Sequence, residues 1–392
     1  MLGLSNLLWI NFLYLFPFCF VAGAFFPFSS AVISDLQQEN KIGKSYAFES
    51  IGAIIGAVLV NFLVIYYVDL KTILLMNSAV NIIMIGVYYV GWKGMYFSKS
   101  LLLIALFVSA FLLFNFDLKK INEVYLYKNQ SVEQIIETKY GSIVITNFYG
   151  QYNLFLNNSL LYSGNQTIAN EEKVHFAMLQ ANSPKNVLVI SGGENRLLQE
   201  ILKYENARID YLEPDEKLYE TGNAVFKTIT SDRINYIDQF AIPFIKTNEK
   251  SYDVILLNAG NPHTIVQSTF LSVEFLGKIA EHLNEDGIFM TYIDVNYNYL
   301  SDAERALTSI IFNSISQYFK YVRLVPGENL YFLASNVPTH QNFVDLLKEK
   351  KLYNEFVNEY YIDDALLNQK AKTLIHSIDE DAGLNSYFHP NA

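Results

Sequence analysis

The sequence has 392 residues and a formal net charge of −11 at pH 7, all of it on residues 118–392, because the charges of residues 1–117 cancel. A chain of this length has room for two or three domains, and so acidic a region is not expected to bind nucleic acid by counterion release. The single cysteine excludes a disulfide framework and a thiolate metal site. The six histidines show no zinc-ligand spacing, so we expect no metal.

The first part of the chain is strongly apolar, and residues 1–117 are predicted to form about four transmembrane helices. Residues 4–33 carry no charge for longer than a bilayer requires. No Lys or Arg precedes this run, which argues against a signal peptide. The other predicted spans are residues 46–68, 70–92 and 101–116. Lysines flank both ends of the spans equally, so the positive-inside rule does not orient them.

From residue 118 the pattern changes to alternation, which predicts a small antiparallel sheet of about four strands. The alternating stretches are residues 124–127, 134–137, 142–146 and 153–156. Tyr149-Gly150 and Asn157-Asn158 are expected turns, and residues 170–181 are expected to be helical. Residues 118–183 are therefore predicted to be a small β domain with a linking helix.

Residues 184–392 begin with a predicted strand–helix–strand unit. An apolar run ends at Ser191-Gly192-Gly193-Glu194, a helical pattern follows, and a second apolar run ends at Glu213. Paired glycines let the backbone pass close to a ligand. Glu213 lies about 20 residues after Gly192, the spacing of a carboxylate that accepts from ribose hydroxyls. Asn195 and Arg196 leave the dinucleotide fingerprint incomplete, which favours a nucleoside without pyrophosphate, such as an S-adenosyl compound. The alternative is a unit whose glycines serve only packing.

The alternation of strand and helix continues to about residue 340. It predicts a Rossmann-like, mostly parallel methyltransferase sheet with ligands at the carboxyl ends of its strands. The further strands are expected at residues 234–237, 252–257, 288–292, 322–325 and 330–333, the last two as an antiparallel pair. The further helices are expected at residues 217–226, 271–283 and 302–318. Residues 341–392 are predicted to be an acidic helical tail.

These motifs resemble the spermidine synthase family of polyamine aminopropyltransferases, in particular its membrane-anchored bacterial branch. The stretch Leu188-Val-Ile-Ser-Gly-Gly-Glu194 looks like the family's Gly-Gly-Gly-Asp loop, and Glu213 matches its ribose-binding Glu. Asp238 matches the Asp near the adenine, and Gln134 falls near a Gln of the β domain. The resemblance implies that decarboxylated S-adenosylmethionine, or a related S-adenosyl nucleoside, binds as co-substrate to Gln134, Gly192, Gly193, Glu194, Glu213 and Asp238. The resemblance extends only to the branch's last few spans, so we expect a short or amino-terminally clipped member.

The resemblance breaks down where a polyamine would bind. In the family a primary amine attacks the methylene carbon attached to the sulfonium, and a base removes its proton. An Asp after the fourth strand and the Tyr of a Tyr-His-Glu motif handle that proton. Asn258 and Val174 occupy these positions here, Asn261 replaces a second Asp, and Phe176 replaces the Glu. His175 and Asn261 remain the expected substrate-facing residues, no catalytic residue is intact, and we expect impaired aminopropyl transfer.

Each of these residues also fits a structural role. Asn258 and Asn261 are common turn formers, and Asp238 is placed to cap a helix starting at Phe240. Gln134 and His175 suit structural positions. Glu194 suits the first turn of a helix, where the dipole favours a carboxylate.

Two classes of function therefore stay open. The first is a membrane-anchored, S-adenosyl-dependent aminopropyltransferase, impaired or with an altered acceptor. The second is a non-catalytic nucleoside-binding sensor or membrane scaffold. Expected partners are a lipid bilayer, a polyamine in the first class, and either a second copy or another chain that supplies further membrane helices. A nucleoside ligand would place the soluble part on the cytoplasmic side of a bacterial inner membrane.

Overall fold

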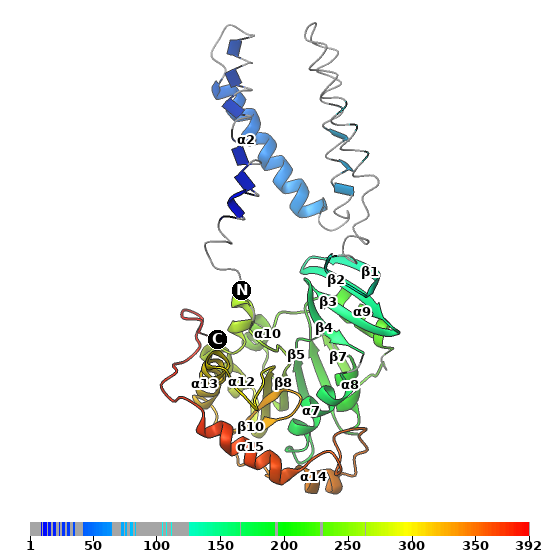
Figure 1. The fold of residues 1–392 in the computed structure, drawn as a ribbon, viewed down its shortest axis with the longest axis vertical. Helices are drawn as coiled ribbons and strands as arrows, with labels where there is room; N and C mark the ends of the chain where they lie inside the picture. Colours follow the sequence, from blue (N-terminus) through cyan, green and yellow to red (C-terminus); the bar gives the residue numbers. More distant parts are fainter. Residues whose placement is uncertain are drawn as a thin grey trace. The chain divides into compact units, whose positions relative to one another are not determined.

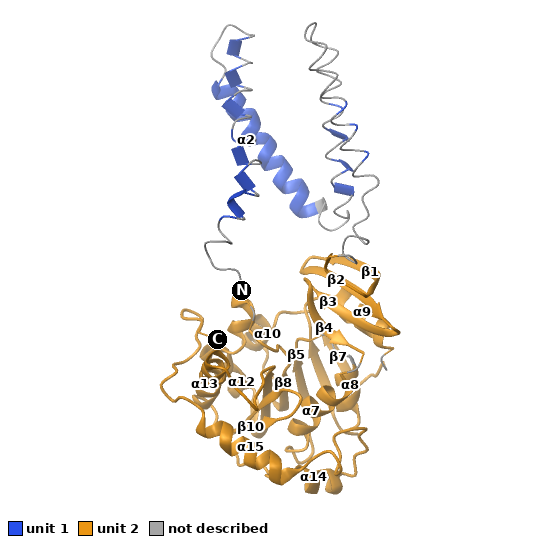
Figure 2. Cartoon of the chain, in the orientation of Figure 1, with its two compact units in different colours: residues 1–116 blue, residues 117–392 orange. Residues whose placement is uncertain are grey.

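The computed structural model describes residues 42–64, 125–164, 166–192, 195–227, 230–262 and 264–391, with scattered positions in residues 9–35, 72–83 and 104–111. The chain divides into two compact units, Met1–Phe116 and Asp117–Ala392 (Figure 2).

In the first unit the longest described element is helix α2 (Ile42–Leu59), which continues into a π-helical turn, η1 (Val60–Val64). Within the described residues, Ile42–Phe62 is the one stretch long and apolar enough to cross a membrane, with a mean hydropathy of 1.4. It overlaps the predicted span 46–68. Most of the other three predicted spans lies outside the described residues, so a four-span region stays a prediction.

The second unit begins with a four-stranded antiparallel sheet in the order β1-β2-β3-β4 (Figure 1). Its strands are β1 (Ser131–Thr138), β2 (Gly141–Phe148), β3 (Gln151–Leu156) and β4 (Ser159–Ser163). Tyr149, Asn157 and Asn158 have positive φ at the two predicted turns. The predicted strand at 124–127 is wrong, since residues 125–127 pair with no strand. Instead Tyr127 packs on the sheet against Val132 and Val144.

The larger sheet has seven strands in the order β10-β11-β9-β8-β5-β6-β7. β7, β6, β5, β8 and β9 are parallel neighbours, while β11 is antiparallel to β9 and to β10. This confirms the predicted Rossmann-like methyltransferase sheet. The strands are β5 (Asn186–Ile190), β6 (Arg208–Leu212), β7 (Ile234–Ile237), β8 (Tyr252–Leu257), β9 (Leu283–Ile293), β10 (Tyr321–Pro326) and β11 (Leu330–Ser335).

Both faces of this sheet are buried. Successive residues of a strand point to opposite faces, so Val187 and Val189 join one apolar core with α7, α8 and α14, while Leu188 and Ile190 join a second core with α12 and α13. The helices of this unit are α7 (Thr167–Met178), α8 (Asn195–Leu202), α9 (Glu216–Phe226), α10 (Ala241–Thr247), α11 (Ile265–Thr269), α12 (Val273–Glu281), α13 (Asp302–Ser316), α14 (Phe343–Lys350) and α15 (Asp364–His376).

Two predicted boundaries are corrected. Strand β9 starts at Leu283, before Gly287, because Tyr252 pairs with Leu283 and Val254 with Ile288, so residues 284–287 bulge out of the ladder. The tail is not continuously helical, because irregular residues 352–363 separate α14 from α15. Helix α15 packs beside β10.

The small sheet packs against α9, where Ile143 and Leu154 contact Leu218. At the end of β1, the Thr138 hydroxyl donates to the Asp215 carboxylate over 2.6 Å. This contact holds the small sheet beside the carboxyl end of β6.

Candidate functional site

Glu213 lies at the carboxyl end of β6, beside the end of β5. Its side chain is buried, and its carboxylate accepts from the backbone N–H groups of Asp215, at 3.1 Å, and Gly192. Burial raises the pKa of Glu213 to about 7, and the nearby charges of Asp215 and Asp238 act in the same direction, against the two backbone donors. The carboxylate is therefore poised between its two protonation states near neutral pH.

Gly192 brings the ends of β5 and β8 into close approach. Its φ is +112°, and a Cβ at this position would clash with the side-chain amide of Asn258. The Asn258 N–H donates to the Ile190 carbonyl at 3.0 Å, which continues the β5–β8 pairing into the loop. Glycine is therefore required at 192 both by backbone conformation and by space.

Asn258 presents an unused acceptor at this point. Its side-chain oxygen is buried and has no hydrogen-bond partner among the described residues. An unpaired buried acceptor costs about 1–3 kcal/mol, so this oxygen is well suited to receive a donor from a ligand. A neutral amide can orient an amine or hydroxyl, but it cannot take up its proton.

Asp238 follows β7 and is exposed. Helix α10 has Phe240 as its N-cap, without a side-chain capping bond, so Asp238 does not fill that structural role. Tyr236 is fixed beside Asp238 by a hydrogen bond from its hydroxyl to the Glu213 carbonyl at 2.8 Å and by stacking on Tyr219. Burial, followed by the charges of Asp238 and Glu213, raises the pKa of Tyr236. Gly192, Glu213 and Asp238 thus come together at the carboxyl edge of the sheet, and their role at a nucleoside stays a prediction.

The other predicted nucleoside contacts are less well placed. Gln134 is exposed on β1, at the register shift between Val132 and Gln134. Thr138, rather than Gln134, makes the side-chain hydrogen bond to Asp215 near the end of β6. Gly193 and Glu194 lie outside the described residues, so their role stays a prediction.

On the acceptor side, His175 is fully buried between α7 and α8. Its Nδ1 lies 3.0 Å from the Tyr204 hydroxyl and its Nε2 lies 3.0 Å from the Glu200 carboxylate. A neutral ring that donates from Nε2 and accepts at Nδ1 satisfies both contacts. Burial lowers the pKa of His175, which favours this neutral form. These two contacts already occupy both ring nitrogens.

The remaining acceptor positions are also engaged within the protein. Val174 and Phe176 are core residues, and the Phe176 ring contacts Tyr331. Asn261 donates to the Asp294 carbonyl at 2.9 Å and accepts from the Asp294 N–H at 2.6 Å. The side chain of Asn261 therefore ties the β8 loop to the end of β9.

Sequence reasoning missed Lys173, which lies on this side of the site. Lys173 is nearly buried, and its Nζ is 4.4 Å from the centre of the Tyr292 ring. The Tyr292 hydroxyl in turn lies beside Gly260, in the loop that carries Asn258. Lys173 therefore lies near the loop that carries Asn258, through Tyr292. In the sequence, the only feature that could have pointed to Lys173 was its place next to Val174 in the linking helix.

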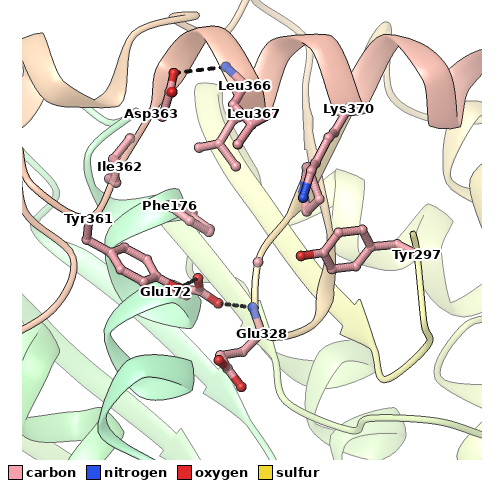
Figure 3. Close-up of a pocket in the computed structure, with 12 residues that line it drawn as sticks. Glu172, Phe176, Tyr297, Glu328, Tyr361, Ile362, Asp363, Leu366, Leu367 and Lys370 are labelled. Carbon is pink, nitrogen blue, oxygen red and sulfur yellow. Dashed lines mark hydrogen bonds between the residues drawn. The ribbon is translucent and has the colours of Figure 1, made fainter. Parts of the chain in front are cut away.

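A cavity of about 250 Å³ opens between α7, the β10–β11 turn and α15 (Figure 3). Figure 3 shows Tyr361 and Glu172 on one side and Tyr297 and Lys370 on the other. The Glu172 carboxylate accepts from the Tyr361 hydroxyl at 2.8 Å, the Tyr331 hydroxyl at 2.9 Å and the Glu328 N–H at 2.7 Å. Burial raises the pKa of Glu172. The cavity adjoins the acceptor side through Phe176.

Within the described part of the chain, no group of three or more His, Cys, Asp and Glu side chains could hold a metal ion.

An open sheet of this strand order, with a glycine turn after β5 and an acid after β6, defines a fold of the methyltransferase-like class. Residues 166–344 match the family described as "Spermine/spermidine synthase domain", and this part of the chain belongs to that family.

Curated relatives agree with this assignment. Polyamine aminopropyltransferase 2 of Aquifex aeolicus is 29% identical over 181 residues, which cover 43% of this chain and 37% of that protein. Polyamine aminopropyltransferase of Methanocaldococcus jannaschii is 24% identical over 247 residues, or 61% of this chain and 82% of that protein. The enzyme of Streptococcus pneumoniae is 33% identical over 171 residues, or 42% and 57%.

Two solved structures share the fold. Spermidine synthase from Thermotoga maritima has a TM-score of 0.51 and 16% identity, covering 62% of this chain and 88% of its own. A spermidine synthase in complex with the transition state analogue AdoDATO has a TM-score of 0.50 and 16% identity, covering 62% and 87%.

Proposed function

We propose that this protein is a membrane-anchored aminopropyltransferase-type protein that binds decarboxylated S-adenosylmethionine or a related S-adenosyl nucleoside, and that its transfer of the aminopropyl group to a polyamine is impaired. The family of residues 166–344 and the names of the relatives support the general type. The transition state analogue AdoDATO in a structural neighbour supports an S-adenosyl ligand.

The arrangement of the residues expected at the nucleoside supports binding. An ionised Glu213 has lone pairs left to accept from ribose hydroxyls after its two backbone donors are counted. Gly192 lets Asn258 approach the end of β5, and Asp238 is available at the neighbouring strand end. Because burial holds the pKa of Glu213 at about 7, binding is expected to tighten as the pH rises through this value.

The acceptor side lacks the chemistry of the transfer step. In that step the amine nitrogen forms a bond to the methylene carbon, the carbon–sulfur bond breaks, and its electron pair returns to sulfur to give methylthioadenosine. The amine must also lose a proton, and a positioned base contributes roughly 10²–10⁴-fold to such a step. The observation that carries our proposal is the neutral amide of Asn258 beside Gly192, at the position of the family's base.

Membrane anchoring is proposed from the apolar residues 1–117, of which Ile42–Phe62 is long enough to span a bilayer. Binding a nucleoside from the cell would place residues 118–392 in the cytoplasm, at a bacterial inner membrane.

The test is calorimetric titration of the detergent-solubilised full chain with decarboxylated S-adenosylmethionine, S-adenosylmethionine and methylthioadenosine, followed by a turnover assay with putrescine. We expect binding of at least one nucleoside and turnover near the detection limit. Failure of all three to bind would refute the nucleoside site. Rapid turnover would refute the impairment.

A second candidate is a non-catalytic nucleoside sensor or membrane scaffold. The internal engagement of His175 and Asn261 favours it, because neither side chain is left to handle a substrate. It predicts nucleoside binding with no transfer to any amine acceptor, whereas an enzyme with an altered acceptor predicts transfer to at least one.

A further inference from the structure

The small sheet has two faces with different surroundings. Its inner face packs against α9 through a cluster that includes Ile143 and Leu154. Because side chains alternate along a strand, the neighbouring cross-strand partners Val144 and Phe155 lie on the outer face.

The chain enters the domain across this outer face. Tyr127 is buried against Val132 and Val144, and its hydroxyl donates to the Asn158 side chain at 3.1 Å. The Gln130 side-chain oxygen accepts from Asn153, another outer-face residue. Residues 125–130 therefore lie on the face turned away from α9.

Apolar side chains remain exposed around this entry segment. Tyr149 is 95% exposed and Tyr125 is 73% exposed. The Phe148 ring contacts the Tyr149 ring and belongs to the outer face by alternation with Val144, and Leu160 joins this face as the partner of Phe155. The outer patch consists of Tyr125, Leu126, Phe148, Tyr149 and Leu160. Phe148 lies at the β2–β3 turn and Leu160 beside the β3–β4 turn, so these groups are spread along the outer face. Exposed apolar groups that share one face indicate a contact surface.

We infer that the outer patch inserts into the headgroup region of the bilayer that anchors residues 1–117. The inference rests on the membrane anchoring proposed above. Residues 117–124 connect the apolar unit to Tyr125, and a segment of this length spans at most about 30 Å when fully extended. The tether thus confines Tyr125 to the neighbourhood of the membrane surface. Tyrosine favours this zone, because its ring is apolar and its hydroxyl can remain hydrated.

The attraction is apolar rather than electrostatic. Lys128 is exposed in the entry segment, while Glu137 is exposed on the same face of β1, so the charges offset each other. Insertion should therefore occur in uncharged phosphatidylcholine and persist at high salt, which screens surface charges.

The test uses the full chain in phosphatidylcholine nanodiscs, labelled with an environment-sensitive fluorophore at one introduced cysteine. The natural Cys19 is the only cysteine and is first replaced by alanine. The probe site is Tyr149→Cys. The matched control is Tyr353→Cys, which is 90% exposed after α14. Both substitutions replace a highly exposed tyrosine, so neither should disturb the fold.

We expect the label at 149 to be blue-shifted, quenched by spin-labelled lipid and protected from aqueous iodide, while the label at 353 shows the reverse. Equal iodide quenching at both sites would overturn the inference while leaving the anchoring intact. Protection at 149 without lipid quenching would also overturn it, in favour of cover by a second copy. A chain that fails to enter nanodiscs would overturn both the anchoring and the inference.

Discussion

Replacing Glu213 by Gln changes the hydrogen bonding at the expected nucleoside site, while the side chain keeps nearly the same size and shape. The carboxylate now meets two backbone donors, from Gly192 and Asp215. An amide offers one acceptor oxygen in place of two, so either a backbone N–H or a ribose hydroxyl loses its partner. Hydrogen bonds to a charged group contribute about 1.5–3 kcal/mol each. We therefore expect Glu213→Gln to weaken nucleoside binding by about 2 kcal/mol, or roughly 30-fold in Kd.

The same substitution should remove a pH dependence. The folded-state pKa of Glu213 is about 7, above its ordinary value of 4.5, so between these values the folded protein holds a proton that the unfolded chain has released. The parent should therefore lose stability as the pH rises through this window, by an amount on the order of 3 kcal/mol. Nucleoside affinity should change in the opposite sense, because the ionised carboxylate is the better acceptor. The Glu213→Gln variant should show neither effect.

Nucleoside affinity can be measured by calorimetric titration of the full chain with methylthioadenosine at about pH 6 and about pH 8, on either side of the perturbed pKa. Stability can be measured by thermal unfolding at about pH 4 and about pH 8, which bracket the whole window between the ordinary and the raised pKa. Glu220→Gln is a suitable control, because it removes an equal charge from an exposed position on α9. Equal Kd values for the parent and Glu213→Gln would mean that Glu213 only organises the strand ends.

Three further predictions concern other parts of the site and its support. Asn258→Asp should raise the rate of aminopropyl transfer to putrescine by up to roughly 10²-fold. Asn261→Asp should give no gain, because residue 261 must donate to the Asp294 carbonyl. Equal transfer rates for the two variants would contradict the assignment of Asn258 to the base position. Glu171→Gln should lower the free energy of unfolding by about 2 kcal/mol and speed hydrogen exchange at 355–357, since the Glu171 carboxylate accepts three backbone N–H groups there; unchanged exchange would refute this anchoring role. Arg233→Ala should lower the melting temperature by several degrees, because the Arg233 guanidinium donates to carbonyls at the end of α8, including that of Leu202. An unchanged melting temperature would refute this capping role.

Periodicity predicted most of the larger sheet because its strands are short, continuous apolar runs, as in residues 252–257. It failed where tertiary packing overrides a local pattern. Residues 124–127 alternate like a strand, yet Tyr127 packs on the sheet face instead of joining the ladder. The start of β9 was missed because the bulge at residues 284–287 resembles a turn.

In the candidate site, too, some residues could be predicted from local sequence spacing and others could not. Gly192 and Glu213 could be found because the spacing of a βαβ unit fixes which strand ends meet. The partners of His175, Asn261 and Glu172 could not be predicted, because each contact joins residues far apart in the sequence. The run at 170–173 has the polar composition of a solvated helix face, yet Glu172 and Lys173 are buried.

The most direct test of the account is a single-turnover assay in which the full chain, saturated with decarboxylated S-adenosylmethionine, is mixed with putrescine and followed for methylthioadenosine. We expect the nucleoside to be bound but to stay intact, because the amide of Asn258 cannot accept the amine's proton. Formation of methylthioadenosine at a rate typical of enzymes, on the order of 1 s⁻¹ or more, would contradict it.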